Sequence, residues 1–180
     1  LDGLHSYGSL EGKRVAVNGA TGGVGHFALQ MAKNKGAIVT AICSGTKADW
    51  ARALGADTVI DYQEEDFTRS GRKYDIIFDA YGRLGFQRAS PALTECGVYI
   101  TTQAGPVDRL KSVWRRTRGR KQSRGANAIN RPDRYTELER LVQVGEVTPL
   151  IEHTFPLSQA ARAIETLESG MAVGKVIIQM

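Results

Sequence analysis

The 180-residue chain lacks the features that define several large protein classes. It holds two cysteines, Cys43 and Cys96, which are too few for a disulfide framework and form no Cys-x-x-Cys pair. It has no apolar run of about 18 residues, which a membrane-spanning helix needs, and no basic-then-apolar leader at its start. These absences predict a protein without membrane spans in a reducing, cytoplasmic environment.

Catalytic signatures are also scarce. His5, His26 and His153 do not cluster, and none stands at a metal-ligand spacing with a cysteine, so no metal site is predicted. The chain shows no Ser-His-Asp order and no paired-carboxylate motif, and the acidic run 64–66 is interpreted as a solvated helix start. The sequence therefore assigns no catalytic residue.

The composition does favour a folded domain that binds anions. The chain is 42% hydrophobic, which is enough to bury a substantial core, and its formal net charge is +5. A modest positive charge favours anionic ligands, which include both nucleotides and nucleic acids.

The stretch from Val15 to Gly25 is the most informative part of the sequence. A short β-branched run leads into a loop in which Gly19, Gly22 and Gly25 are three residues apart. This spacing suits a tight turn, a close approach of backbone N–H groups to a phosphate, and close packing of a helix on a strand. An amphipathic helix is predicted from about 23 to 35, and its N-terminal end attracts anions. The pattern predicts a pyrophosphate-binding loop.

Strands and helices then alternate with short connections. We predict strands at 13–18, 37–42, 58–61, 74–79 and 97–102, with short helices at 46–55 and 86–93. In the first of these short helices, Thr46 is the expected N-cap, and Trp50 and Leu54 are expected to face inward. The alternation predicts an α/β fold, a doubly wound parallel sheet of the Rossmann type with helices on both faces.

The alternation breaks after Gly105. A sixth strand is predicted at 126–129, and a C-terminal α+β segment follows. That segment has an expected helix from Pro132 to Val144, a strand near 150–155, a helix capped by Ser158 and a last strand at 175–178. We expect a dinucleotide-binding domain at 1–130 and a separate C-terminal segment at 131–180.

A basic run between residues 109 and 124 leaves an alternative open. Eight cations and Trp114 fall within sixteen residues. Such a run could bind a nucleic-acid backbone, lie near an anionic cofactor, or form a solvated face. The alternative function is therefore a nucleotide-sensing or nucleic-acid-binding module that uses 109–124.

Several motifs together resemble one known family. Gly19-Ala-Thr-Gly-Gly-Val-Gly25, Leu54-Gly-Ala-Asp-Thr-Val-Ile-Asp-Tyr62, Tyr74-Asp-Ile-Ile-Phe-Asp-Ala80 and Gly174-Lys-Val-Ile-Ile178 occur in the order seen in that family. The chain resembles the quinone oxidoreductase (zeta-crystallin-like) branch of the medium-chain dehydrogenase/reductase superfamily. The resemblance implies NADPH-dependent hydride transfer to a quinone or an α,β-unsaturated carbonyl, and it implies a homodimer.

The resemblance also implies that an N-terminal GroES-like catalytic domain precedes the point where this chain begins. In the family, the last part of the chain completes that domain, which also shares the substrate pocket and carries most zinc ligands. We therefore expect this chain alone to be inactive. We also expect an exposed apolar patch around Leu138, Leu141, Ile151 or Phe155.

The end of the second predicted strand indicates which cofactor is bound. An NAD site has Asp or Glu there, whereas this chain has Ser44 and Lys47, and a lysine suits a 2′-phosphate. In the family, the matching Lys and the Tyr of the Asp-Tyr pair, here Tyr62, bracket the 2′-phosphate of NADPH. The expected cofactor-binding residues are Gly19, Ala20, Gly22, Gly23, Val24, Gly25, Ser44, Lys47, Tyr62, Ala80, Tyr81, Thr101, Thr102 and Gln103.

Overall fold

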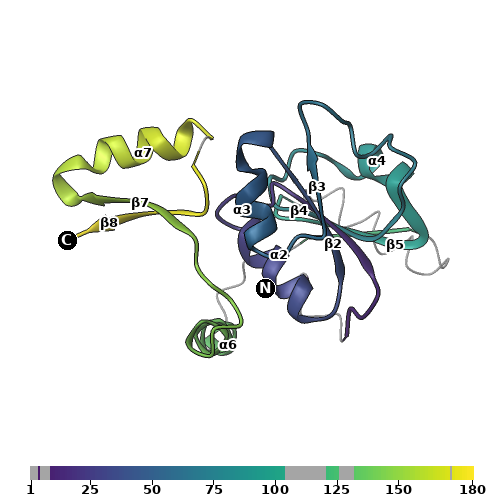
Figure 1. Cartoon of the computed structure of the whole chain (residues 1–180), viewed down its shortest axis with the longest axis horizontal. Coiled ribbons are helices and arrows are strands. Elements are labelled where there is room, and N and C mark those ends of the chain that lie inside the picture. Colours follow the sequence, from purple (N-terminus) through teal and green to yellow (C-terminus); the bar gives the residue numbers. More distant parts are fainter. Residues whose placement is uncertain (1–3, 5–8, 104–120, 126–131, 171) are drawn as a thin grey trace.

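The main body is a six-stranded parallel sheet with the strand order β3-β2-β1-β4-β5-β6 (Figure 1). The computed structural model describes residue 4 and residues 9–103, 121–125, 132–170 and 172–180. This strand order is that of the doubly wound dinucleotide-binding fold, so the predicted architecture is confirmed. The strands are β1 (Arg14–Asn18), β2 (Ile38–Cys43), β3 (Thr58–Asp61), β4 (Tyr74–Asp79), β5 (Leu93–Thr101) and β6 (Gln122–Gly125).

Alternate residues of the central strands fill two separate cores, one on each face of the sheet. Val17 and Ile76 pack with α2 (Gly25–Asn34) and α3 (Ala48–Ala53) in one core. Ala16, Ile77 and Tyr99 pack with α4 (Phe86–Ala89) and the 3-10 turn η2 (Ser90–Ala92) in the other. Because side chains of a strand point alternately to opposite faces, both faces of these strands are apolar, as buried parallel strands require.

The helix that follows β2 starts later than the sequence predicts. A 3-10 turn, η1 (Gly45–Lys47), comes first, and α3 begins only at Ala48 with Lys47 as its N-cap residue and no side-chain cap. The predicted N-cap at Thr46 and the inward position of Trp50 are therefore wrong. Ala51 and Leu54 pack on the core, while Trp50 is exposed.

Two other boundaries differ from the prediction. The expected helix at 86–93 ends by 92, because Leu93 already belongs to β5. The sixth strand lies at Gln122–Gly125, whereas the predicted range 126–129 is outside the described residues.

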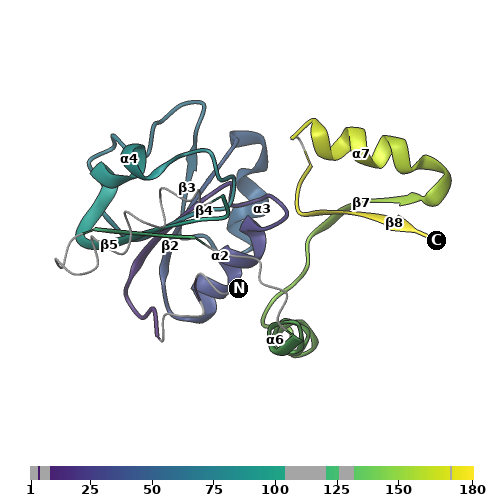
Figure 2. The ribbon, with the colours of Figure 1, turned by 180° about the vertical axis from the view of Figure 1, so that it is seen from behind.

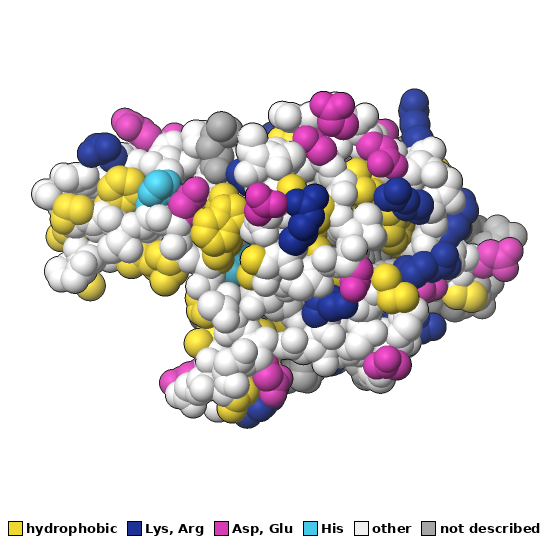
Figure 3. Space-filling view, viewed as in Figure 1, with side chains coloured by type: hydrophobic (Ala, Val, Ile, Leu, Met, Phe, Trp, Pro, Cys, Tyr) yellow, Lys and Arg dark blue, Asp and Glu magenta, His cyan; other side chains and the backbone are white. Residues whose placement is uncertain are grey.

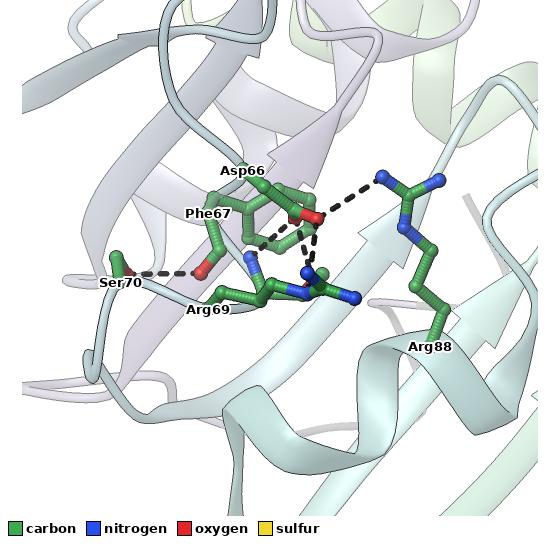
Figure 4. Close-up of polar contacts among 6 residues, drawn as sticks. Asp66, Phe67, Arg69, Ser70 and Arg88 are labelled. Atoms are coloured by element: carbon green, nitrogen blue, oxygen red, sulfur yellow. Dashed lines mark hydrogen bonds and ion pairs between the residues drawn. The ribbon is translucent and has the colours of Figure 1, made fainter.

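The acidic run 64–66 begins no helix. Asp66 Oδ1 accepts hydrogen bonds from the Thr68 N–H at 3.0 Å and the Thr68 hydroxyl at 2.7 Å, and its other oxygen contacts Arg88 at 3.1 Å (Figure 4). These bonds, led by that from the Thr68 hydroxyl, hold the pKa of Asp66 below its usual value. The carboxylate thus closes a turn and ties it to α4.

The C-terminal unit is a separate small layer. Strands β7 (Ile151–Pro156) and β8 (Lys175–Gln179) form a two-stranded parallel sheet, connected through the 3-10 turn η3 (Leu157–Gln159) and α7 (Ala160–Glu168) (Figures 1 and 2). Gln159 is the N-cap residue of α7 and no side chain caps the helix, so the predicted Ser158 cap is wrong. No described helix has the length and apolarity that a membrane span requires.

Helix α6 (Pro132–Gln143) and the residues after it attach this unit to α2. The Gln30 side-chain amide donates to the Thr148 carbonyl at 3.0 Å and accepts from the Thr148 N–H at 2.8 Å. Leu141 and Val147 pack against Met31 in a small apolar cluster. The C-terminal unit is therefore joined to the main body by both polar and apolar contacts.

Apolar side chains are exposed on the C-terminal unit, as predicted, but of the four residues named in the prediction only Ile151 is among the exposed ones. Leu141 packs on α2, and only 8% of its surface is accessible. Leu138 and Phe155 are half-buried. Ile151 is 52% exposed. Figure 3 shows hydrophobic side chains gathered on this unit. The exposed apolar side chains of this unit lie on more than one of its faces; we call them together the C-terminal apolar surface, and they are Ile151, Leu157, Ile164, Leu167, Ile177, Ile178 and Met180.

Candidate functional site

The glycine loop leaves β1 at the point where the strand order reverses, between β1 and β4. Gly19 has φ +74°, a conformation that side chains disfavour, and it packs against Tyr81, which follows β4. The N–H groups of Gly19 and Ala20 donate to the Ile42 carbonyl at 3.0 and 3.1 Å. The loop is thus fixed at the edge where ligands bind in such sheets.

Gly25 lets α2 approach the loop closely. A Cβ atom at this position would overlap the Gly19 carbonyl oxygen and stand 2.9 Å from Ala20 Cα. At Gly22, by contrast, an added Cβ would make only an ordinary contact of 3.4 Å with the Gly19 oxygen. Of the three roles expected for the loop glycines, close packing of helix on strand is the one that requires glycine at position 25.

The entrance of α2 leaves donors unused. Val24 is the N-cap residue and no side chain caps the helix. Among the described residues, no acceptor faces the N–H groups of Gly23, Val24 or Gly25. These unbonded donors and the positive end of the helix dipole would both favour an anion at this point.

Lys175 adds a cation beside these donors, a role that was not predicted from the sequence. Its Nζ would stand 3.5 Å from a Cβ built on Gly23, and it lies 5.8 Å from the centre of the Phe27 ring. The preceding residue, Gly174, donates its N–H to the Thr21 carbonyl at 2.8 Å. The signal was present in the Gly174-Lys motif, but only the fold brings that motif to the glycine loop.

His26, in the first turn of α2, packs beneath the glycine loop. Its side chain is fully buried, and Nδ1 lies 2.9 Å from the Gly22 carbonyl oxygen. Within the described residues, Nε2 has no hydrogen-bond partner. Burial lowers the pKa of His26, and the charge of Lys175 acts in the same direction. The neutral ring therefore donates from Nδ1 and supports the Gly22 peptide.

Ser44, Lys47 and Tyr62 come together at the ends of β2 and β3. Cys43 and Asp61 are paired in register, which brings Ser44 and Tyr62 side by side. Tyr62 is 58% exposed. Ser44 Oγ lies 3.0 Å from Thr46 Oγ1, and Lys47 Nζ donates to the Gly170 and Ala172 carbonyls at 3.4 and 3.3 Å.

A carboxylate also lies at this edge, but it serves the backbone. Asp61 accepts from the Gly45 N–H at 2.8 Å and from the Gln63 N–H at 2.9 Å. Burial, together with the charge of Asp61, raises the pKa of the neighbouring Cys43 thiol, which is therefore neutral and packs as a small apolar group.

The loop after β4 is held by Asp79. This fully buried carboxylate accepts from Asn18 Nδ2 at 2.8 Å, from the Gly82 and Leu84 N–H groups at 3.0 Å, and from the Tyr99 hydroxyl at 2.7 Å. Burial and the bond to Asp79 raise the pKa of Tyr99, so its hydroxyl stays protonated. Asp79 thus links the end of β1, the following loop and β5.

This rigid loop presents Tyr81 to solvent. Tyr81 is 59% exposed, and the Arg83 guanidinium carbon lies 5.3 Å from its ring centre. Thr102 Oγ1 donates to the Ala80 carbonyl at 3.3 Å, and the Gln103 side chain lies against Gly82. The ends of β4 and β5 are therefore connected.

Three predicted site residues have limited freedom. Ala20 is buried with its N–H already bonded. Thr101 is buried, and its hydroxyl accepts from the Gln103 N–H at 3.2 Å. Ala80 is half-buried and packs on the core. Any contact of these residues with a ligand would be through their backbone.

Comparison with known proteins gives three informative similarities. The zinc-binding dehydrogenase family model matches residues 54–178. The chain is 32% identical over 177 residues to a chloroplastic quinone-oxidoreductase homologue of Spinacia oleracea, covering 96% of this chain and 54% of that protein. It is 31% identical over 206 residues to the mitochondrial NAD(P)H oxidoreductase RTN4IP1 of Mus musculus, covering 96% and 49%.

A solved structure gives the same result. The quinone oxidoreductase of Coxiella burnetii superimposes with a TM-score of 0.86 at 28% identity, covering 99% of this chain and 56% of that one. The chain belongs to the zinc-binding dehydrogenase family. Within the medium-chain dehydrogenase/reductase superfamily it groups with the quinone oxidoreductases. The chain spans about half the length of these relatives.

The family name implies zinc, but the described residues do not fit it. No group of three His, Cys, Asp or Glu side chains in the described part of the chain could hold a metal ion. We therefore derive no step through zinc.

Proposed function

We propose that this chain is the cofactor-binding part of an NADPH-dependent oxidoreductase that transfers hydride to a quinone or an α,β-unsaturated carbonyl. The observation that carries the proposal is the glycine loop, whose unused N–H donors lie at the strand-order reversal of the sheet. NADPH supplies the hydride when bound, and the protein supplies its position and electrostatic environment.

The pyrophosphate would lie over the entrance of α2. The N–H groups of Gly23 and Val24 would donate to it, and the Lys175 ammonium would offset part of its charge. His26 would hold the Gly22 peptide in place through the hydrogen bond from its Nδ1 to the Gly22 carbonyl. The loop thus matches a phosphate in both charge and hydrogen-bonding capacity.

The 2′-phosphate would lie between the ends of β2 and β3. Ser44 and Tyr62 offer hydroxyls there, and Lys47 offers a cation within the same loop. In NAD-binding sites an Asp or Glu accepts a hydrogen bond from the ribose 2′-hydroxyl. Asp61 would not take this role, because its two oxygens already accept from the Gly45 and Gln63 N–H groups.

The nicotinamide end would follow the loops after β4 and β5. Asp79 and Gln103 hold these loops in one arrangement, so Tyr81 and Thr102 would meet the cofactor on a preorganised surface.

The substrate pocket would need a further domain. The sheet of the C-terminal unit has only two strands, and the C-terminal apolar surface is exposed beside it. An N-terminal catalytic domain, as the family resemblance implies, would cover this surface and complete the pocket. The 180-residue chain should therefore bind NADPH yet show no measurable reductase activity; turnover by this chain alone would contradict the proposal.

Lys47 provides the test of cofactor choice. Replacing Lys47 with Glu should weaken NADPH binding at least tenfold and leave NADH binding within about twofold, since a carboxylate repels a 2′-phosphate of about −1.5 to −2 charge. The Kd of each cofactor is measured by the fluorescence of its nicotinamide. Lys13→Glu, at the opposite end of β1, is the matched control. An unchanged ratio of the two Kd values in Lys47→Glu would overturn the assignment.

The nucleic-acid alternative rests on the sequence of 109–124. Residues 104–120 lie outside the described part, whereas Lys121 donates to the Ser90 carbonyl at 2.7 Å. A nucleic-acid titration at two salt concentrations separates the hypotheses, because phosphate contacts lose affinity steeply with salt. The homodimer and the cytoplasmic location remain predictions.

A further inference from the structure

Lys47 already has partners in this structure. Its ammonium donates to the carbonyls of Gly170 and Ala172, at 3.4 and 3.3 Å, just beyond the last residue of α7, Glu168. The carboxyl end of a helix carries partial negative charge and is stabilised by a nearby cation. Lys47, which belongs to the main body, therefore holds the segment just after α7, which belongs to the C-terminal unit.

The residues that follow are anchored next to the glycine loop. The Val173 N–H donates to Glu152 Oε2 at 2.6 Å, and the Gly174 N–H donates to the Thr21 carbonyl at 2.8 Å. Val173 is buried. Gly170 and Ala172 thus contact Lys47, and Gly174 contacts the glycine loop, so these residues touch both ends of the proposed dinucleotide site.

We propose that the end of α7 is a specificity determinant of the cofactor site, because the Gly170 and Ala172 carbonyls compete with a 2′-phosphate for Lys47. The inference rests on the proposed function, which assigns Lys47 to that phosphate. A lysine ammonium is a compact charge, and a phosphate is a stronger partner for it than neutral carbonyls are. The negative end of α7 also repels a phosphate. Binding of the 2′-phosphate draws Lys47 away from α7.

The competition has a reciprocal consequence. If a 2′-phosphate weakens the attachment of the α7 end, then loosening that end must strengthen binding of the 2′-phosphate by the same factor. A ligand without that phosphate leaves Lys47 on the carbonyls and has no such effect. The C-terminal unit therefore reduces the preference of this chain for a phosphorylated cofactor.

Amide hydrogen exchange of the 180-residue chain tests the first direction. The chain is saturated either with adenosine 2′,5′-bisphosphate or with AMP, which differ only by the 2′-phosphate. The Val173 and Gly174 amides should exchange roughly threefold faster with the bisphosphate than with AMP, the change expected when a modest hydrogen-bonding contact is lost. Equal or slower exchange with the bisphosphate would overturn the inference.

A variant tests the reverse direction. Glu152→Ala removes the acceptor of the Val173 N–H and should tighten bisphosphate binding roughly threefold while AMP binding stays constant. Glu165→Ala, on the exposed side of α7, is the control and should change neither. If Glu152→Ala does not fold, the hydrogen-exchange measurement on the unmodified chain still tests whether the carbonyls and the phosphate compete for Lys47.

Lys47→Met separates this inference from the proposed function. If Lys47→Met leaves the ratio of bisphosphate to AMP affinity unchanged, Lys47 does not select the phosphate and both fail. If the ratio falls but the bisphosphate does not speed exchange at Val173 and Gly174, the cofactor assignment stands and only the competition is wrong.

Discussion

Gly25 shows how the absence of one side chain can shape a binding loop. A methyl group there would overlap the Gly19 carbonyl oxygen, which is itself part of the turn that closes β1. The position therefore tolerates only glycine, and it does so for packing rather than for an unusual φ angle, since Gly25 is not among the glycines with positive φ.

Gly25→Ala should consequently destabilise the chain by about 2–4 kcal/mol, because the helix must move away from backbone atoms that cannot yield. Gly22→Ala, whose added carbon meets only an ordinary contact at 3.4 Å, should cost less than about 1 kcal/mol. Urea denaturation of both variants makes the comparison. Equal losses of unfolding free energy would show that close packing does not distinguish the two glycines.

His26 should make stability depend on pH. Its folded-state pKa lies below its unfolded value of about 6.5, so the unfolded chain binds the proton more readily. Stability is then complete above pH 6.5 and falls as the pH drops below it, by at most about 1.4 kcal/mol per pH unit. Unfolding free energies at pH 7.5 and 5.5 should differ more in the natural chain than in His26→Phe. An identical pH dependence in the two proteins would contradict this role.

At the scale of elements, Gln30 connects α2 to the C-terminal part by pairing with both backbone groups of Thr148. Because Thr148 is 118 residues away in sequence, no local pattern could reveal this pairing. In the sequence, Gln30 begins the run Gln30-Met-Ala-Lys33, which follows the glycine loop and adds to the family resemblance but does not reveal a partner in Thr148.

Gln30→Ala should loosen the C-terminal part without unfolding the sheet. Losing two hydrogen bonds of about 0.5–1.5 kcal/mol each should speed exchange of the Thr148 amide at least threefold, while amides of β1 and β4 stay protected. Gln143→Ala is the control, since that side chain makes only an exposed bond to Glu139 at 3.5 Å. Uniformly faster exchange in Gln30→Ala would mean that the whole fold, not this junction, had been weakened.

The strands were easier to predict than the helix ends. Buried parallel strands have continuous apolar runs, which is why β2, β3 and β4 fall within a residue of their predicted bounds. The start of α3 was missed because a 3-10 turn has no strong sequence signature, and its insertion rotates Trp50 outward.

At the scale of the whole molecule, the C-terminal apolar surface is the largest departure from an ordinary folded domain. A two-stranded sheet with one helix is a marginal structure by itself, and Ile164 and Leu167 of α7 are both 53% exposed. This arrangement favours association.

Replacing both Ile164 and Leu167 with Glu should lower binding of a hydrophobic dye severalfold and reduce concentration-dependent association. The free energy of unfolding should change by less than about 1 kcal/mol, since exposed positions contribute little to stability. Dye fluorescence and sedimentation provide the measurements. Trp50→Glu, an exposed change on the main body, controls for charge alone. If dye binding is undiminished in the double variant, Ile164 and Leu167 are not the residues that bind the dye.

The glycine loop could be predicted from the sequence because its residues, Gly19 to Gly25, are neighbours in the chain. Lys175 could not, because it reaches Gly23 only through the docking of the C-terminal unit. Lys47 was identified, but its bonds to Gly170 and Ala172 depend on tertiary structure in the same way.

The long separation between Gln30 and Thr148 has a kinetic consequence. The contacts of β1 with β2 and β4 join residues far closer in sequence, and closing a longer loop costs more chain entropy. We expect the sheet to form early during refolding and the 147–180 stretch to dock afterwards. During synthesis, β7 and β8 would leave the ribosome after the strands of the main body and meet a sheet that had already begun to fold.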